Sequence, residues 1–203
     1  MAATQPIQSL AFLLRARVGR RAVQWMLLLG CLCNASLSLA QGGALSAVSE
    51  STVKAAFLYK FAGYVQWPDA PTGAAATPIM IGVVGASDFA QELSQITQGR
   101  TVSDRPINVR RLADGDSIED LHILFIAQEE KARLQDLLAA VRGRPILTVT
   151  ESEGALSDGS IINFTVDEQR VRFEVSLYAA QLSQLRLNSR LLAVARQVYR
   201  VPE

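Results

Sequence analysis

The eight residues "PIMIGVVG", Pro78 to Gly85, decide the fold class of this chain. They form a continuous apolar run of strand length, which is typical of a β-strand that is buried on both faces of a sheet. Two similar runs follow, "HILFIA" at 122–127 and "PILTVT" at 145–150. Strands of this kind need a layer of helices on each side, so the three runs predict an α/β domain.

The segments between these runs predict helices and an edge strand. Apolar residues recur at helical spacing after the first run, where a capping box of Asp88 and Gln91 opens a helix that ends at Gly99. A second helix is expected at 128–142. The segment "RPINVRR" at 105–111 alternates apolar and polar side chains and contains a proline, which predicts an edge strand.

The C-terminal part predicts a hairpin followed by two helices. "IINFTV" and "RVRFEVSL", within residues 161–177, are the two strands of the hairpin. The tail that follows is expected to be mostly helical, with a kink or a short extended link near 186–188, because Asn188 or Ser189 is a good N-cap in its middle. Residues 50–203 are therefore predicted to form a single α/β domain. Its mixed sheet would have about five to six strands, with helices on both faces.

The first helix of the domain lies in "AAFLYKFAGYVQWP", residues 55–68, and starts at Ser49 or Ser51. One apolar stripe is predicted to pack in the core, and it consists of Val53, Phe57, Phe61, Tyr64 and Val65. The residues predicted to lie off this stripe are Leu58, Tyr59, Ala62 and Trp67. An uncharged face with aromatic anchors suits a partner-binding or dimer-forming surface. The alternative is that neighbouring helices cover this face.

The first forty residues predict a secretory signal. Four arginines precede a short apolar run, and Ser38 and Ala40 are placed for cleavage before Gln41. "LLGC" also resembles a lipoprotein signal, which would attach a lipid to Cys31. Both routes export the domain, and an uncleaved anchor is the alternative. The predicted organisation is a signal segment at 1–40, a linker at 41–49 and the domain at 50–203.

Cysteine content and charge exclude several function classes. Both cysteines, Cys31 and Cys33, lie in the signal segment, so a chain cut at Ala40 has no disulfide, no thiolate metal site and no cysteine nucleophile. It keeps 16 basic and 19 acidic residues, a net charge of −3. This balance offers no electrostatic basis for binding nucleic acid.

No set of convergent reactive groups is recognisable, so we expect no enzyme activity, no metal and no cofactor. His122 is the only histidine, and it opens a buried strand, where a hydrogen-bonded structural role is expected. The acidic segment Asp114–Asp120 lacks the ligand spacing of a calcium loop. "GVVGASDF" lacks the glycine pattern and the lysine of a phosphate-binding loop.

One speculative effector site is predicted at the break in the C-terminal helices. Arg186, Asn188 and Arg190 lie there, where backbone groups are free to bind. These side chains would bind a small anionic or aromatic molecule. The alternative is that Asn188 only caps the second helix.

Several segments, taken in their order and spacing, resemble the YfiR family of the bacterial periplasm over roughly Val53–Tyr199. They are "VKAAFLYKFAGYVQWP", "PIMIGVVG", "DFAQEL", "LHILFIA", "ILTVTES", "GSIINFTVDEQRVRFEVSLYAAQ" and "LRLNSRLLAVARQV". The resemblance implies a non-catalytic regulator, expected to be a homodimer. Leu121 stands where family members often have a cysteine, so redox control of the exported domain is not expected.

The resemblance also implies partners. Such a regulator holds the periplasmic domain of an inner-membrane diguanylate cyclase inactive, which limits cyclic di-GMP and biofilm formation. An outer-membrane lipoprotein that binds peptidoglycan can sequester the regulator. Two alternatives stay open: a small-ligand sensor that acts on a histidine kinase, and a hydrolase without a recognisable motif.

Overall fold

The computed structural model describes residues 49–68 and 77–201. The predicted signal segment, and all of the predicted linker except Ser49, lie outside these ranges. The elements are α2 (Glu50–Tyr64), β1 (Val65–Gln66), β2 (Ile79–Val84), α3 (Ser87–Thr97), β3 (Thr101–Val102), β4 (Arg105–Arg111), β5 (Ile123–Ile126), the 3-10 helix η1 (Gln128–Arg133), α4 (Leu134–Val141), β6 (Leu147–Thr150), β7 (Ile162–Asp167), β8 (Arg170–Ser176), α5 (Leu177–Leu182), β9 (Arg186–Leu187), α6 (Ser189–Val194) and β10 (Gln197–Tyr199).

The domain is built on one mixed sheet, which confirms the predicted α/β class. The strand order is β10-β8-β7-β6-β5-β2-β4-β3, and β1 pairs separately with β9. The five central strands, β4, β2, β5, β6 and β7, are parallel to one another. The prediction of about five to six strands is wrong, because the described sheet has eight. The three-residue strand β10 lies in the tail that was expected to be mostly helical.

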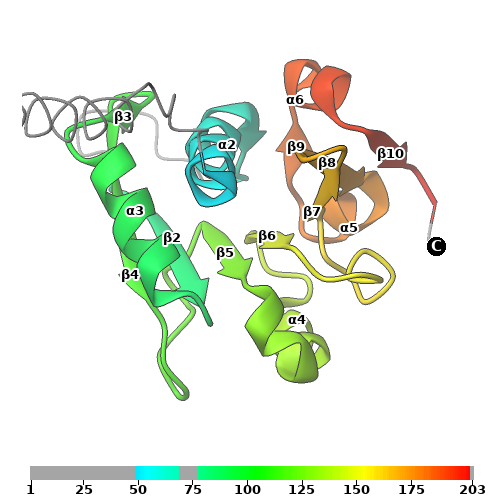
Figure 1. Cartoon of the computed structure of the whole chain (residues 1–203), viewed down its shortest axis with the longest axis horizontal. Helices are drawn as coiled ribbons and strands as arrows, with labels where there is room; N and C mark the ends of the chain where they lie inside the picture. The colour runs from blue at the N-terminus through cyan, green and yellow to red at the C-terminus, as the bar shows by residue number, and fades with distance from the viewer. Residues whose placement is uncertain (1–48, 69–76, 202–203) are drawn as a thin grey trace, which may run out of the picture. The chain divides into compact units, whose positions relative to one another are not determined.

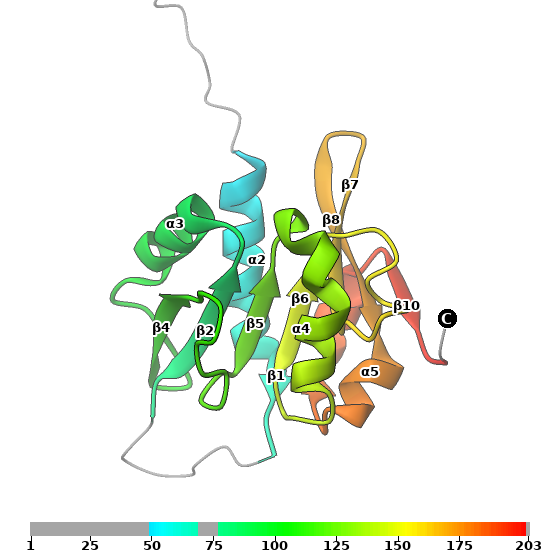
Figure 2. The same cartoon turned by 90° about the horizontal axis from the view of Figure 1, so that it is seen from below.

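Two layers of helices enclose the sheet (Figures 1 and 2), with α2 and α3 on one face and α4 on the other. The strand residues alternate between two separate clusters. Ile81 and Phe125 pack in the cluster that includes α2 and α3, whereas Val84 and Leu124 pack with α4. A strand that is buried on both faces needs apolar side chains at every position. This explains the continuous apolar runs in the sequence.

The helix ends agree with the predictions in part. Ser49 is the N-cap of α2, and its side chain accepts a hydrogen bond from the backbone of Thr52, as expected of one of the two predicted caps. The capping box of Asp88 and Gln91 is wrong. The N-cap of α3 is Ala86, which has no side-chain hydrogen bond, and Asp88 already lies in the first turn.

Helix α2 is buried on most of its circumference, which no single apolar stripe predicts. It contacts α3, α6 and β8. Leu58, Phe61 and Ala62 are all at most 2% exposed. The exposed positions in its middle and end are Ala56, Lys60 and Gly63, a narrow stripe.

Candidate functional site

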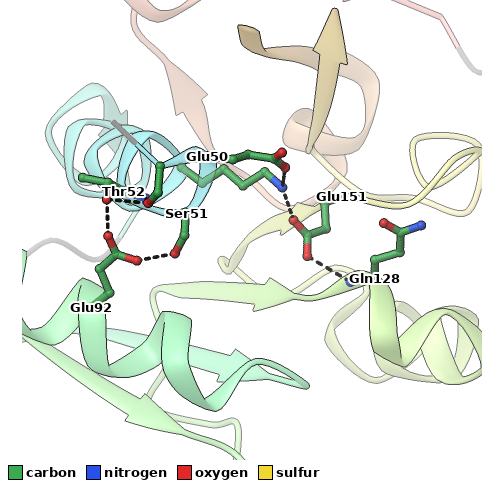
Figure 3. Close-up of polar contacts among 8 residues, drawn as sticks. Glu50, Ser51, Thr52, Glu92, Gln128 and Glu151 are labelled. Atoms are coloured by element: carbon green, nitrogen blue, oxygen red, sulfur yellow. Dashed lines mark hydrogen bonds and ion pairs between the residues drawn. The ribbon is translucent and has the colours of Figure 1, made fainter. Parts of the chain in front are cut away.

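The carboxyl edge of the parallel strands is the first place to look for a site. From β2 the chain passes to α3 on one face, and from β5 it passes to α4 on the other. Ligands of open α/β sheets usually bind in the crevice that opens where two such crossovers diverge. Here side chains in the first turns of α2 form hydrogen bonds to α3 on one side and to Glu151, after β6, on the other (Figure 3).

Two carboxylates hold α2 at this edge. Ser51 and Thr52 both donate side-chain hydrogen bonds to Glu92 of α3. Lys54 Nζ lies 2.5 Å from Glu151 Oε2, just after β6. The other oxygen of Glu151 accepts the backbone N–H of Gln128 at 3.0 Å. The polar side chains at the carboxyl edge of the sheet are therefore paired with one another.

The lysine in this network stays charged. Burial lowers the pKa of Lys54, but its hydrogen bonds to Glu151 and Glu50 outweigh burial, so the pKa is raised above its ordinary value. A lysine with a raised pKa is a poor base and a poor nucleophile at neutral pH. The network therefore has a structural role, which is to hold α2 against α3 and the end of β6.

The glycine turn after β2 does not form a phosphate site. Gly85 has a φ of +86°, and a Cβ atom there would lie 2.6 Å from Cγ of Glu130. The stem of Glu130 thus packs directly over the turn, and its carboxylate would repel a bound anion. This geometry supports the prediction that "GVVGASDF" only ends a strand.

His122 lies at the opposite, amino edge of the sheet and has the structural role that was predicted. Its Nε2 lies 2.7 Å from Nη2 of Arg105, and its Nδ1 accepts the backbone N–H of Met80 at 3.2 Å. Trp67 packs edge-on against the ring and donates its Nε1–H to the His122 carbonyl at 3.3 Å. Burial, and then the charge of Arg105, hold the pKa of His122 below its ordinary value.

Of the four residues that were predicted to bind a partner, two are buried and two are half-buried. Leu58 is 0% and Ala62 2% exposed, so the prediction that these two lie on an outward face is wrong. Tyr59 is half-buried, with the guanidinium of Arg100 5.2 Å from its ring centre. Trp67 is half-buried beside His122. A binding role for Tyr59 and Trp67 stays a prediction.

The three predicted effector residues have different surroundings in the structure. Asn188 is the N-cap of α6 and accepts the backbone N–H of Arg190 at 2.9 Å, which is the simpler of its two predicted roles. Arg186 lines an open hollow beside α5 together with Trp67. Within the described ranges, Asn188 and Arg190 are not part of that lining. Effector binding stays a prediction.

A cavity that the sequence did not indicate lies between α4, the loop after β6, α5 and β10. Its volume is about 210 Å³. Three large apolar side chains at its rim are exposed to solvent, and they are Tyr178, Leu182 and Val201. Val201 follows β10, a segment that was expected to be helical, so its place beside α5 was not predicted.

Metal-binding and membrane-spanning features were searched for in residues 49–68 and 77–201. Within these ranges no three potential metal-ligating side chains cluster together. No helix in them is long and apolar enough to cross a bilayer.

The comparison with known families agrees with the resemblance that the sequence suggested. The model of the YfiR/HmsC-like family matches residues 51–196. The match begins in the first turn of α2 and ends between α6 and β10, so it includes every strand of the sheet except β10. The chain therefore belongs to the YfiR/HmsC-like family.

Proposed function

We propose that this protein is a periplasmic regulator that binds the periplasmic domain of an inner-membrane diguanylate cyclase and holds the enzyme inactive. Family membership over residues 51–196 is the observation that carries this proposal. Cyclic di-GMP, and with it biofilm formation, would then be limited. An outer-membrane lipoprotein that binds peptidoglycan is the proposed partner that relieves the inhibition, and the regulator itself is proposed to act as a homodimer.

The proposal requires export of the domain. Residues 1–40 supply the signal, with cleavage after Ala40 or lipid attachment at Cys31 as the two routes. N-terminal sequencing and mass spectrometry of the periplasmic protein distinguish the routes. Retention of residues before Cys31 would contradict both.

The test is co-expression of the full chain with a membrane diguanylate cyclase encoded next to it, with cyclic di-GMP measured by mass spectrometry. We expect lower cyclic di-GMP than with the cyclase alone, and co-purification of the two proteins from detergent extracts. A chain that lacks residues 1–40 is the matched control, because it stays in the cytoplasm and cannot reach the periplasmic domain. Equal cyclic di-GMP with and without the exported chain would contradict the proposal.

A second candidate function is a small-ligand sensor that acts on a histidine kinase. The cavity of about 210 Å³ beside α5 favours it, because a space of this size accepts a molecule not much larger than benzene. Its rim includes the exposed Tyr178. A thermal-shift screen of periplasmic small molecules, repeated on Leu182→Arg to fill the mouth, tests this function. A stabilising ligand that acts equally on both proteins would bind elsewhere.

A further inference from the structure

The outer edge of β4 is unusually open for a strand of its length. Strand β3 pairs with it only at Arg105 and Pro106. Along Ile107–Arg111 the inner side is paired with β2, and within the described residues no strand lies on the outer side. Figure 2 shows β4 at the margin of the sheet. An unpaired strand edge is a template for another extended chain.

The register of the sheet identifies which backbone groups point outward. Leu112 donates its N–H to the carbonyl of Val83 at 2.8 Å, so Leu112 faces β2. Successive residues of a strand direct their N–H and C=O groups to opposite sides. The groups of Val109 and Arg111 therefore point away from β2, toward the open side.

A groove runs beside this open edge, between β4 and the C-terminal half of α3. Its volume is about 770 Å³. The charged residues among its lining are Arg100 and Arg110, both positive, and the other lining side chains are neutral. Pro106 and Val109 supply apolar surface in it.

The positive charges near the groove are only partly neutralised. Arg110 Nη2 binds Asp120 at 2.9 Å. Arg100 stacks on the ring of Tyr59, and Arg111 donates a hydrogen bond to Ser87 Oγ at 2.9 Å. Neither arginine forms an ion pair with another described residue. Arg100 and Arg111 lie near opposite ends of the open edge, so an extended chain with acidic residues near its two ends would match them.

We propose that the outer edge of β4 is the docking site for an extended acidic segment of a partner protein, which pairs with Ile107–Arg111 as an added strand. Main-chain hydrogen bonds to Val109 and Arg111 supply affinity, and the two unpaired arginines select an acidic sequence. The periplasmic domain of the cyclase is the expected source of this segment, and this identification alone rests on the proposed function. Charges and a proline on an edge strand also protect against aggregation, so the test must separate attraction from protection.

The probe is a synthetic peptide of about seven residues, matched to the open edge in length, with alternating valine and threonine and a glutamate at each end. Its control carries lysine at both ends. Titration of the full exported chain, followed by NMR amide shifts and hydrogen exchange, should show protection of the Val109 and Arg111 amides by the acidic peptide. We expect binding of the lysine peptide to be at least about tenfold weaker. Equal binding of the two peptides, or shifts confined to another edge, would overturn the inference.

Two variants test the mechanism. Val109→Pro removes an outward N–H and no bond to β2, so it should fold and lose peptide binding. Arg100→Glu should weaken the acidic peptide by about tenfold and strengthen the lysine peptide. Arg142→Glu, an exposed change on the α4 side, is the matched control and should bind as the unchanged chain does. If Val109→Pro fails to fold, the reversal of charge preference in Arg100→Glu still decides.

Two other occupants of the edge are conceivable, the chain's own residues and a second copy, and finding either of them there would overturn the inference. Protection of Val109 and Arg111 in the monomeric chain without peptide would mean that the chain's own residues cover the edge. A dimer that Val109→Pro converts to monomer would assign the edge to a second copy. Failure of cyclase binding, with the acidic peptide still bound at β4, would remove the proposed function and leave the docking site. Cyclase binding that survives Val109→Pro would remove the cyclase as the source of the segment and leave the proposed function.

Discussion

Acidification should destabilise this domain through His122. Each ring nitrogen of His122 has a hydrogen-bond donor beside it, the guanidinium of Arg105 at 2.7 Å from Nε2 and the backbone N–H of Met80 at 3.2 Å from Nδ1. The neutral imidazole has one lone pair and accepts one of these bonds, while the backbone of Asp120 hydrogen-bonds the ring and favours its charged form. A protonated imidazole has no lone pair and cannot accept either bond. Protonation would also put a positive charge on the ring next to the positive charge of Arg105. Solvent would screen this repulsion weakly, because Arg105 is only 7% exposed.

The sign of the effect follows from the pKa. The folded-state pKa of His122 is lower than its ordinary value of 6.5, chiefly through burial and then through Arg105. Between the two pKa values the unfolded chain binds more protons than the folded one, so the free energy of unfolding rises with pH. The contribution of His122 is fully present above about pH 6.5 and is lost as the pH falls through the folded-state pKa. In that window one proton changes the free energy of unfolding by about 1.4 kcal/mol per pH unit.

The assay is urea unfolding of the exported chain, followed by circular dichroism, at intervals from pH 8 down to about pH 5. His122→Gln is the comparison, because its amide oxygen still accepts a hydrogen bond from Arg105 but does not titrate. Carboxylates elsewhere titrate in both proteins, so the difference between their pH profiles isolates His122. We expect the unchanged protein to lose stability more steeply below about pH 6.5 than the variant does. Parallel profiles, or a gain in stability of the unchanged protein on acidification, would refute the reasoning.

Three further changes test the packing and the polar contacts by the same unfolding assay. Gly82→Ala should cost about 1–3 kcal/mol, because the added Cβ would lie 2.6 Å from a methyl group of Leu112, and an unchanged midpoint would show that the sheet relaxes freely. Lys54→Met should cost about 1–3 kcal/mol by leaving the carboxylate of Glu151 with fewer partners, and adding Glu151→Leu should recover most of the loss. Asn188→Ala should cost about 1 kcal/mol as the loss of an N-cap, and an additional loss of effector response in the folded variant would support the predicted effector role.

The strands that are buried on both faces of the sheet were predictable, because their sequences are continuous apolar runs. The runs at β2, β5 and β6 are apolar at almost every position because both faces are covered. The link near 186–188 was predictable because Asn188 is a cap in the middle of a helical pattern. Strand β10 was not predictable, since its three residues lie within a helical sequence pattern and its pairing with β8 depends on the tertiary fold.

The polar contacts at the carboxyl edge could not be predicted for a related reason. Ser51 and Glu92 are 41 residues apart, and Lys54 and Glu151 are 97 apart. Each of these side chains is ordinary for a helix or strand end when taken alone. Only the order of the strands brings α2, α3 and the end of β6 together.

The two phenylalanines of α2 pack against the hairpin. Phe61 lies 5.0 Å from Phe173 and 5.9 Å from Phe164, measured between ring centres, and Phe57 lies 5.4 Å from Phe173. These contacts fasten the N-terminal helix to β7 and β8, which are far away in the sequence. These two phenylalanines therefore belong to the core, and truncating Phe61 to alanine should cost about 3–5 kcal/mol.

The surface that α2 leaves for a partner is small and has one charge. Its exposed stripe in the middle and at the end consists of Ala56, Lys60 and Gly63, which offers little apolar area, and the half-buried Tyr59 is the aromatic side chain left to test. Loss of regulation in a Phe61 variant would therefore report unfolding and not a lost contact. Lys60→Glu in a folded protein is the change that tests whether a partner contacts α2 at all, because it reverses the one charge of the stripe without touching the core. Unchanged regulation in that variant would direct the search for the partner surface to the edges of the sheet.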